Sequence, residues 1–395
     1  MNNFLKYGAL AALVGFSGAA MADTAETKDG LTIKTEDGRF EGKLGGRIHF
    51  DGNLIDGDEN GRSDADISDV FFRRARLTLS GKAYGWEYKF EQDFAGGAPS
   101  ERDLYIATKF GPGKVYLGQF KHYNGMEEMT SSNEITFMER PYVQANFFGN
   151  QQFGMGLGYK GGIGKAGTYA FSVQNSKVDG DGNNSNEDLY TSARLTYAPL
   201  LADASVVHLG LSYANENINT ERFTGNPPVS AGDTGGAINI QYAGRSVGSV
   251  SLLNNYNEAT FVGLEAATVQ GPFYLQAEYA LGKADFLAGN PSQDTAAYYV
   301  QASWHVTGES KPYKSGVFKS VKPAKAGGAV ELKARYEFAE NKDRVDAEVE
   351  AFTVGANWYV NPNVRFMLEY ISAETKAGLG ADEPKVVTAR TQFSF

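Results

Sequence analysis

One polar stretch, residues 118–141, carries side chains that commonly do chemistry or bind ions. It reads GQFKHYNGMEEMTSSNEITFMERP, in a region where the alternation of apolar and polar residues found on either side stops. Its carboxylates could act as acids or bases, and its hydroxyls and guanidinium could bind an anion. The loss of alternation favours a loop over a strand. The side chains concerned are Glu127, Glu128, Glu134, Glu139, Ser131, Ser132 and Arg140.

Motifs that would indicate an enzyme occur without the structure that they need. A G-x-G-x-x-G pattern at 156–161 lies inside an alternating segment, so we interpret it as small residues on a strand. A G-x-S-x-G pattern at 244–248 is not followed by a predicted helix. The chain has no cysteine, and its histidines are isolated from one another. We therefore predict no catalytic residues, no metal site and no cofactor.

Two acidic segments resemble the first half of a calcium-binding loop. They span 56–61 and 179–185, but Ile67 and Tyr190 stand at the twelfth position, where such loops place a bidentate glutamate. We interpret both as solvated loops, and leave weak surface binding of calcium as an alternative.

Charged residues at every second position indicate strands with one wet face. Arg74, Arg76 and Lys82 share a face of segment 72–83, and the next segment repeats this with Glu87 and Asp93 at its ends. Unpaired charges cannot face a dry core. These side chains either solvate a wide interior or set up a field that biases which ions pass.

Sixteen alternating segments can be placed along the chain, joined by tight turns and long polar loops in turn. This pattern, with 47 glycines and 13% aromatic residues, predicts an all-β transmembrane antiparallel barrel with long extracellular loops. A soluble sandwich or propeller is the alternative, and segment 236–256 could raise the number of strands to eighteen. The segments are 40–50, 72–83, 86–94, 103–110, 113–121, 153–160, 168–174, 189–197, 205–214, 260–268, 272–281, 295–306, 329–338, 351–360, 363–373 and 386–395.

The ends of the chain predict export. Residues 1–22 read as a signal peptide, 23–38 as a periplasmic segment and 39–395 as the barrel, which places the protein in the bacterial outer membrane. The net charge of −10 argues against nucleic acid as a partner. One connection that should be a short periplasmic turn, 307–328, is instead long and basic. Its lysines are Lys311, Lys314, Lys319, Lys322 and Lys325.

Several blocks of sequence resemble the phosphate-selective porin O and P family. They include FFRRARLTLSG, GQFKHYNGMEEMTSSNEITFMER, TGESKPYKSGVFKSVKPA and VGANWYVNPNV, and the similarity runs from about residue 30 to the C-terminus. The resemblance implies a sixteen-stranded, homotrimeric porin whose third loop folds inward and narrows a channel for phosphate and other anions.

The resemblance also implies roles for individual residues. Ser131, Ser132 and Arg140 match the anion-contacting positions of the inward loop, and Asp103 matches an acid of the constriction. Arg73 and Arg74 match arginines of the wall, although the alternation places only Arg74, with Arg76, in the lumen.

Two positions depart from the family pattern. Glu128 and Asn133 stand where strongly phosphate-selective members have lysines, and the inward loop carries more acids than bases. We therefore predict a passive porin for small hydrophilic solutes, with anions such as phosphate favoured by the resemblance. The alternatives are a general or weakly cation-leaning porin and a barrel without transport, such as an adhesin or a hydrolase at the membrane rim.

Overall fold

The computed structural model describes most of the chain. The described residues are 24–26, 30–56, 67–97, 99–144, 148, 152–175, 189–218, 236–243, 249–286 and 290–395. The predicted signal peptide, the calcium-like segment 179–185 and the G-x-S-x-G pattern at 244–248 lie outside them.

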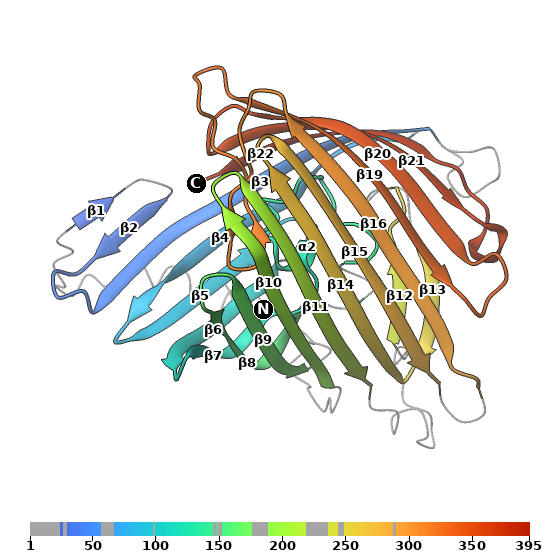
Figure 1. The fold of residues 1–395 in the computed structure, drawn as a ribbon, viewed down its shortest axis with the longest axis horizontal. Helices are drawn as coiled ribbons and strands as arrows, with labels where there is room; N and C mark the ends of the chain where they lie inside the picture. Colours follow the sequence, from blue (N-terminus) through green and yellow to red (C-terminus); the bar gives the residue numbers. More distant parts are fainter. Residues whose placement is uncertain are drawn as a thin grey trace, which may run out of the picture.

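Sixteen antiparallel strands form a closed barrel (Figure 1). Each follows its neighbour in sequence, and β22 closes the wall by pairing with β3, where Arg390 lies opposite Asp51. Each of the sixteen predicted segments is one of these strands, with boundaries that differ by up to six residues. The strands are β3 (Phe40–Asp56), β4 (Ile67–Ala83), β5 (Trp86–Asp93), β6 (Ser100–Phe110), β7 (Gly113–Lys121), β8 (Phe153–Ile163), β9 (Gly167–Asn175), β10 (Leu189–Ala202), β11 (Ser205–Asn217), β14 (Glu258–Gln270), β15 (Phe273–Asp285), β16 (Gln293–His305), β19 (Ala329–Asn341), β20 (Glu348–Tyr359), β21 (Val364–Thr375) and β22 (Lys385–Ser394).

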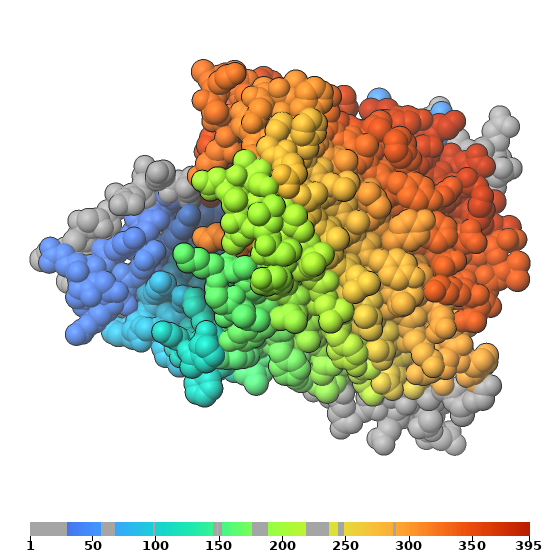
Figure 2. All heavy atoms as spheres, in the orientation of Figure 1, coloured from blue at the N-terminus to red at the C-terminus, as the bar shows by residue number. Residues whose placement is uncertain are grey.

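The alternative of eighteen wall strands is wrong. The region 236–256 does form two strands, β12 (Gly236–Ile240) and β13 (Val250–Tyr256), but they pair only with each other. Their apolar side chains pack in one buried cluster with small residues of the wall such as Ala259 and Ala280. The hairpin therefore fills part of the barrel instead of widening it. Two further strands, β1 (Thr24–Glu26) and β2 (Leu31–Lys34), extend the sheet from β3 (Figure 1), and β2 projects beyond the barrel with the start of β3 (Figure 2).

The alternation of side chains places apolar residues on the outer, lipid-facing surface and polar residues in the lumen. Along β11, Leu209, Leu211 and Tyr213 are exposed on the outer surface, whereas His208 and Ser212, on the opposite face of the strand, are buried in the lumen. Strands of a membrane barrel require this pattern because their two faces meet different solvents. In the part of the chain that the structure describes, no helix is long and apolar enough to cross a membrane.

An irregularity in β4 changes which arginines face inward. Pairing with β3 shifts between His49, which lies opposite Arg74, and Phe50, which lies opposite Phe72. Arg73 is therefore the extra residue of a β-bulge. Both Arg73 and Arg74 turn toward the lumen as a result, so the expectation that strict alternation admits only Arg74 is wrong.

Besides the hairpin of β12 and β13, two other connections fold into the barrel and meet there. The inward loop, 122–152, contains one helical turn, α2 (Met126–Met129), among its described residues. The inward turn, 306–328, carries a hairpin of β17 (Tyr313–Lys314) and β18 (Val317–Phe318). Phe318 and Val317 pack with Met126 and with residues of β11, β14 and β15 in a buried cluster. The two connections thus meet in the lumen. A short 3-10 helix, η1 (Ala377–Leu379), lies between β21 and β22.

Candidate ion-conducting site

Carboxylates of the wall hold the inward loop by its backbone. Glu278 accepts hydrogen bonds from the backbone N–H of Met126 and Glu127, at 2.8 and 2.9 Å. Glu369 accepts one from Met138 at 2.8 Å, and Glu337 accepts one from Tyr142 at 2.9 Å. These carboxylates are buried. Much of the charge that the sequence places in the lumen therefore anchors the loop and is not open to solutes.

Cations of the same wall hold the loop carbonyl groups. Arg365 donates to Ile135 O at 2.9 Å, Lys333 donates to Thr136 O at 3.0 Å, and Arg335 donates to Glu139 O at 2.9 Å. Donors and acceptors together fix the loop against strands β15, β19 and β21. Hydrogen bonds to charged groups are among the stronger ones in proteins. The space that remains lies on the opposite side, next to strands β3 to β8.

A cavity of about 230 Å³ occupies this space, and we call it the constriction cavity. Seven cationic side chains and two carboxylates, Glu91 and Asp103, contribute to its lining. Ser131, Ser132 and several aromatic rings complete it. The cations are Arg47, Arg76, Lys89, Lys121, Arg140, Lys160 and Lys319.

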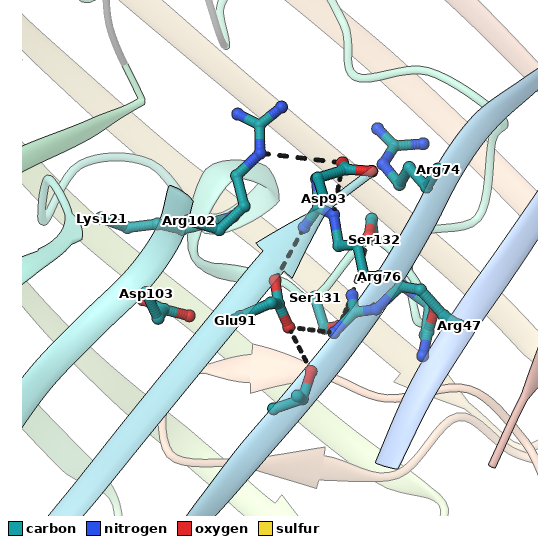
Figure 3. Close-up of polar contacts among 12 residues, drawn as sticks. Arg47, Arg74, Arg76, Glu91, Asp93, Arg102, Asp103, Lys121, Ser131 and Ser132 are labelled. Atoms are coloured by element: carbon teal, nitrogen blue, oxygen red, sulfur yellow. Dashed lines mark hydrogen bonds and ion pairs between the residues drawn. The ribbon is translucent and has the colours of Figure 1, made fainter. Parts of the chain in front are cut away.

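The wall side of the cavity is a network of ion pairs (Figure 3). Glu91 accepts from Arg47 and from Arg76, both at 2.9 Å. Lys89 pairs with Asp103 on the next strand. These ion pairs hold the guanidinium groups of Arg47 and Arg76 and the ammonium group of Lys89 in fixed positions on the wall.

The loop side of the cavity presents hydroxyl groups and cations. Arg47 Nη1 donates to Ser131 Oγ at 3.3 Å and to Ser132 Oγ at 3.0 Å, so both predicted serines meet the wall here. Arg140 also lines the cavity, and its guanidinium donates to the carbonyl groups of Glu127 and Thr130. The structure thus brings Ser131, Ser132, Arg140, Arg76 and Asp103 together.

Glu128 lies behind this surface. It is buried, it does not line the constriction cavity, and its carboxylate lies 2.9 Å from Lys121 Nζ and 3.2 Å from Arg140 Nε. Burial alone would raise the pKa of Glu128, but the charges of Arg140 and Lys121 outweigh it and lower the pKa. Glu128 therefore remains ionised, and it offsets the charges of Lys121 and Arg140 from the side that faces away from the constriction cavity.

The arginines of the bulge clamp the loop and do not line the cavity. Arg73 binds both carboxylate oxygens of Glu139 at 2.7 Å, and Arg74 lies 3.8 Å from the same carboxylate. Burial alone would raise the pKa of Glu139, but Arg73, Arg74 and Arg390 hold it well below its usual value. Asn133, the second departure from the family pattern, accepts a hydrogen bond at its Oδ1 from His49 Nε2, at 3.1 Å.

Sequence reasoning missed Lys160 and the aromatic side of the cavity. Lys160 lies on β8, with its ammonium 4.3 Å from the centroid of the Tyr116 ring, and no carboxylate of the described residues is within ion-pair distance. The signal was present, because alternation along 153–160 places Lys160 on the same face as Gly154, Gly156 and Gly158.

The glycines of β8 make room for the loop. A Cβ on Gly158 would lie 2.7 Å from Phe120 and 2.9 Å from the Tyr123 hydroxyl, and one on Gly154 would lie 2.7 Å from His122. The G-x-G-x-x-G pattern is thus part of a strand on which the start of the inward loop packs.

A second cavity, of about 800 Å³, lies beside the inward turn on the side of the short, periplasmic turns. Lys314 and Lys322 line it, and Lys319 lines both cavities while pairing with Glu134 at 2.6 Å. The other two lysines of the predicted basic cluster lie elsewhere. Lys311 is buried 3.6 Å from Glu331, and Lys325 is exposed.

Comparisons with known proteins agree with this architecture. The model of the family described as phosphate-selective porin O and P matches residues 43–395. Porin O of Pseudomonas aeruginosa is 31% identical, over 96% of this chain and 95% of its own length. An anion-selective porin of Comamonas acidovorans has a TM-score of 0.58 at 12% identity, covering 90% of this chain and 99% of its own. OprB of Pseudomonas putida has a TM-score of 0.59 at 12% identity, covering 89% and 94%. At these identities, the structural likeness concerns the fold alone.

Proposed function

This chain belongs to the phosphate-selective porin O and P family and is a porin of the bacterial outer membrane, and from this premise we propose that it is a passive channel that prefers anions. The observation that carries the proposal is the lining of the constriction cavity, where seven cations face two carboxylates. Fixed charge at the narrowest part of a wet channel raises the local concentration of ions of opposite sign.

The acids of the inward loop do not oppose this proposal, although they led us to consider a weakly cation-leaning porin. Glu128 and Glu139 are each paired with two or more cations, and Glu134 is paired with Lys319. Glu127 turns toward β15, where its carboxylate accepts from Gln276 at 3.0 Å. Charge counted along the loop therefore differs from charge presented to a solute.

We propose small anions in general, without specificity for phosphate. At the two positions where phosphate-selective relatives carry lysines, this chain buries Glu128 and binds Asn133 to His49. Neither adds a positive charge to the cavity. A barrel that acts as an adhesin or a hydrolase is the competing function, and it predicts no steady single-channel conductance in a planar bilayer.

Lys160 gives the sharpest test, because it is the lining cation that has no carboxylate of the described residues within ion-pair distance. Lys160→Gln removes one charge, which at about 4 Å is worth roughly 1 kcal/mol in bulk-like water, or about fivefold in anion permeability. We expect the reversal potential in a KCl gradient to shift toward cations. Lys165→Gln, in the exposed turn of the same hairpin, is the matched control and should have no effect. A cation preference in the unmodified protein would overturn the proposal.

A further inference from the structure

We infer that the preferred solutes are monoanionic carboxylates that carry an aromatic ring, in preference to inorganic phosphate. This inference rests on the proposed function, because it names the class of anion that the same constriction cavity favours. It comes from the side of the cavity that sequence reasoning missed.

Four aromatic rings form a continuous band in the cavity lining. The ring centroids of Tyr105 and Tyr116 are 5.2 Å apart, those of Tyr116 and Phe120 are 6.0 Å apart, and those of Phe120 and Tyr123 are 5.5 Å apart. Such separations are typical of interacting aromatic pairs. Phe153 lines the same cavity. One side of the passage thus offers apolar, polarisable ring faces, with the tyrosine hydroxyl groups and Lys160 as donors at their edges.

Cations lie against these rings. The Lys160 ammonium is 4.3 Å from the centroid of Tyr116 and 5.3 Å from that of Tyr123. The Lys121 ammonium is 5.9 Å from the centroid of Phe153. A ring holds a cation by its quadrupole and leaves the full positive charge for a solute. An anion therefore meets charge and apolar surface in one place.

One polar atom beside the band has no partner. The hydroxyl of Tyr123 is buried and makes no hydrogen bond with any residue that the structure describes. A buried hydroxyl without a partner costs free energy, which a ligand oxygen can recover. Tyr123 can donate to a carboxylate oxygen that also pairs with Lys160, while the remainder of the solute lies along the rings.

Inorganic phosphate fits this arrangement less well. Its oxygens accept hydrogen bonds in all directions, so it needs donors all around it to replace water. The ring faces of the aromatic band donate no hydrogen bonds, so phosphate oxygens that lie against them lose water without replacement. An aromatic carboxylate has a single charge at one end, and its flat remainder needs no donors.

Two probes of equal charge and similar size test the inference. Benzoate and cyclohexanecarboxylate are added to the unmodified channel, and the inhibition of its chloride current is measured as a function of concentration. We expect benzoate to inhibit at roughly two- to tenfold lower concentration, which is the range that an aromatic pair contributes beyond area burial. Equal inhibition by the two probes would overturn the inference.

Variants of the aromatic band test whether its rings cause the difference in inhibition between benzoate and cyclohexanecarboxylate. Tyr116→Leu should remove the difference between the probes, and Tyr105→Leu, at a half-buried position, provides the same test if the first variant fails to assemble. Tyr197→Leu, on the outer surface of β10, is the matched control and should keep the difference. A difference that survives in both band variants would place the aromatic contact elsewhere and overturn the assignment.

Two further measurements separate this inference from the proposed function. Inorganic phosphate is tested in the same inhibition assay, and stronger inhibition by phosphate than by benzoate would overturn the inference. The reversal potential in KCl tests anion preference alone. Anion preference without discrimination between the probes would leave the proposed function intact and refute only the aromatic class.

Discussion

Glu128→Gln should make the channel more anion-selective, although Glu128 does not touch the constriction cavity. The substitution keeps the shape of the side chain and removes its charge. Lys121 and Arg140, which line the cavity, then lose the carboxylate that offsets them from behind. Passing ions should therefore meet one additional unit of positive charge.

The magnitude follows from the distances. The carboxylate lies 2.9 Å from Lys121 Nζ and 3.2 Å from Arg140 Nε, so an anion about 4 Å beyond these cations is roughly 7 Å from the carboxylate. At that distance a unit charge is worth about 0.6 kcal/mol in bulk-like water and roughly 2.4 kcal/mol at an effective dielectric of 20. The change attracts an anion as much as it repels a cation, so the permeability ratio should rise about sevenfold at the wet limit.

The assay is the reversal potential of single channels in a KCl gradient. Glu127→Gln is the matched control, because the neighbouring carboxylate turns away from the cavity toward Gln276 and its loss should leave the ratio unchanged. The effect of Glu128→Gln should be largest near 0.1 M salt and smaller near 1 M, as the Debye length falls from about 10 Å to about 3 Å. An unchanged ratio at low salt, in a protein that still assembles, would refute the placement of Glu128 behind the two cations.

Two further outcomes test the clamp and the assembly. The pKa of Glu139 is lowered well below 4.5 in the folded protein, because the arginines outweigh burial, so its ion pairs persist above the usual pKa and are lost only as pH falls through the lowered value. Arg73→Gln should raise the pKa of Glu139, so the inward loop should be released at a higher pH than in the unmodified protein. The release would be seen as gating in single-channel recordings. Gating that begins at the same pH in both proteins would contradict the clamp. We also expect a trimer that resists mild detergent. On heating, it should dissociate to an electrophoretic band at or slightly below the 42.7 kDa of the full sequence. A monomer in cross-linking experiments would refute this expectation.

The barrel could be predicted from the sequence because apolar and polar residues alternate along each strand, one face of which meets lipid and the other water. Each strand carries this signal by itself, as in the alternation of Leu209, Leu211 and Tyr213 with buried polar residues. No contact between distant residues is needed to read it. Segment 236–256 could be interpreted from the sequence as two possible further strands, but the place of β12 and β13 inside the barrel was not predictable from the alternation.

The candidate site was only partly predictable, because contacts distant in sequence decide which charges face the channel. Arg73 enters the lumen through a bulge that no glycine or proline marks, and it meets Glu139 across 66 residues. Glu128 occupies a position where the family resemblance implies a pore lysine, yet here it is buried beside Lys121 and Arg140. Replacing Glu128 by Lys would bury a third cation beside those two, so we expect it to displace the loop and not simply to add charge to the pore.

The aromatic side of the cavity shows a different limit. Tyr105, Tyr116 and Phe120 lie on neighbouring strands at positions that alternation assigns to the lumen, yet an aromatic residue in a strand is ordinarily interpreted as packing. Only the pairing register brings the three rings together, and only the fold of the inward loop adds Tyr123 to them.

The wall holds the inward loop mainly through the loop's own peptide groups. Glu278, Glu337 and Glu369 bind N–H groups, and Arg365 and Lys333 bind carbonyl groups, and every residue except proline offers both. A mutation that changes a loop side chain facing the solute therefore leaves these contacts in place. Natural selection can alter what the channel admits by single substitutions in the loop, while the strands that fix its path stay as they are.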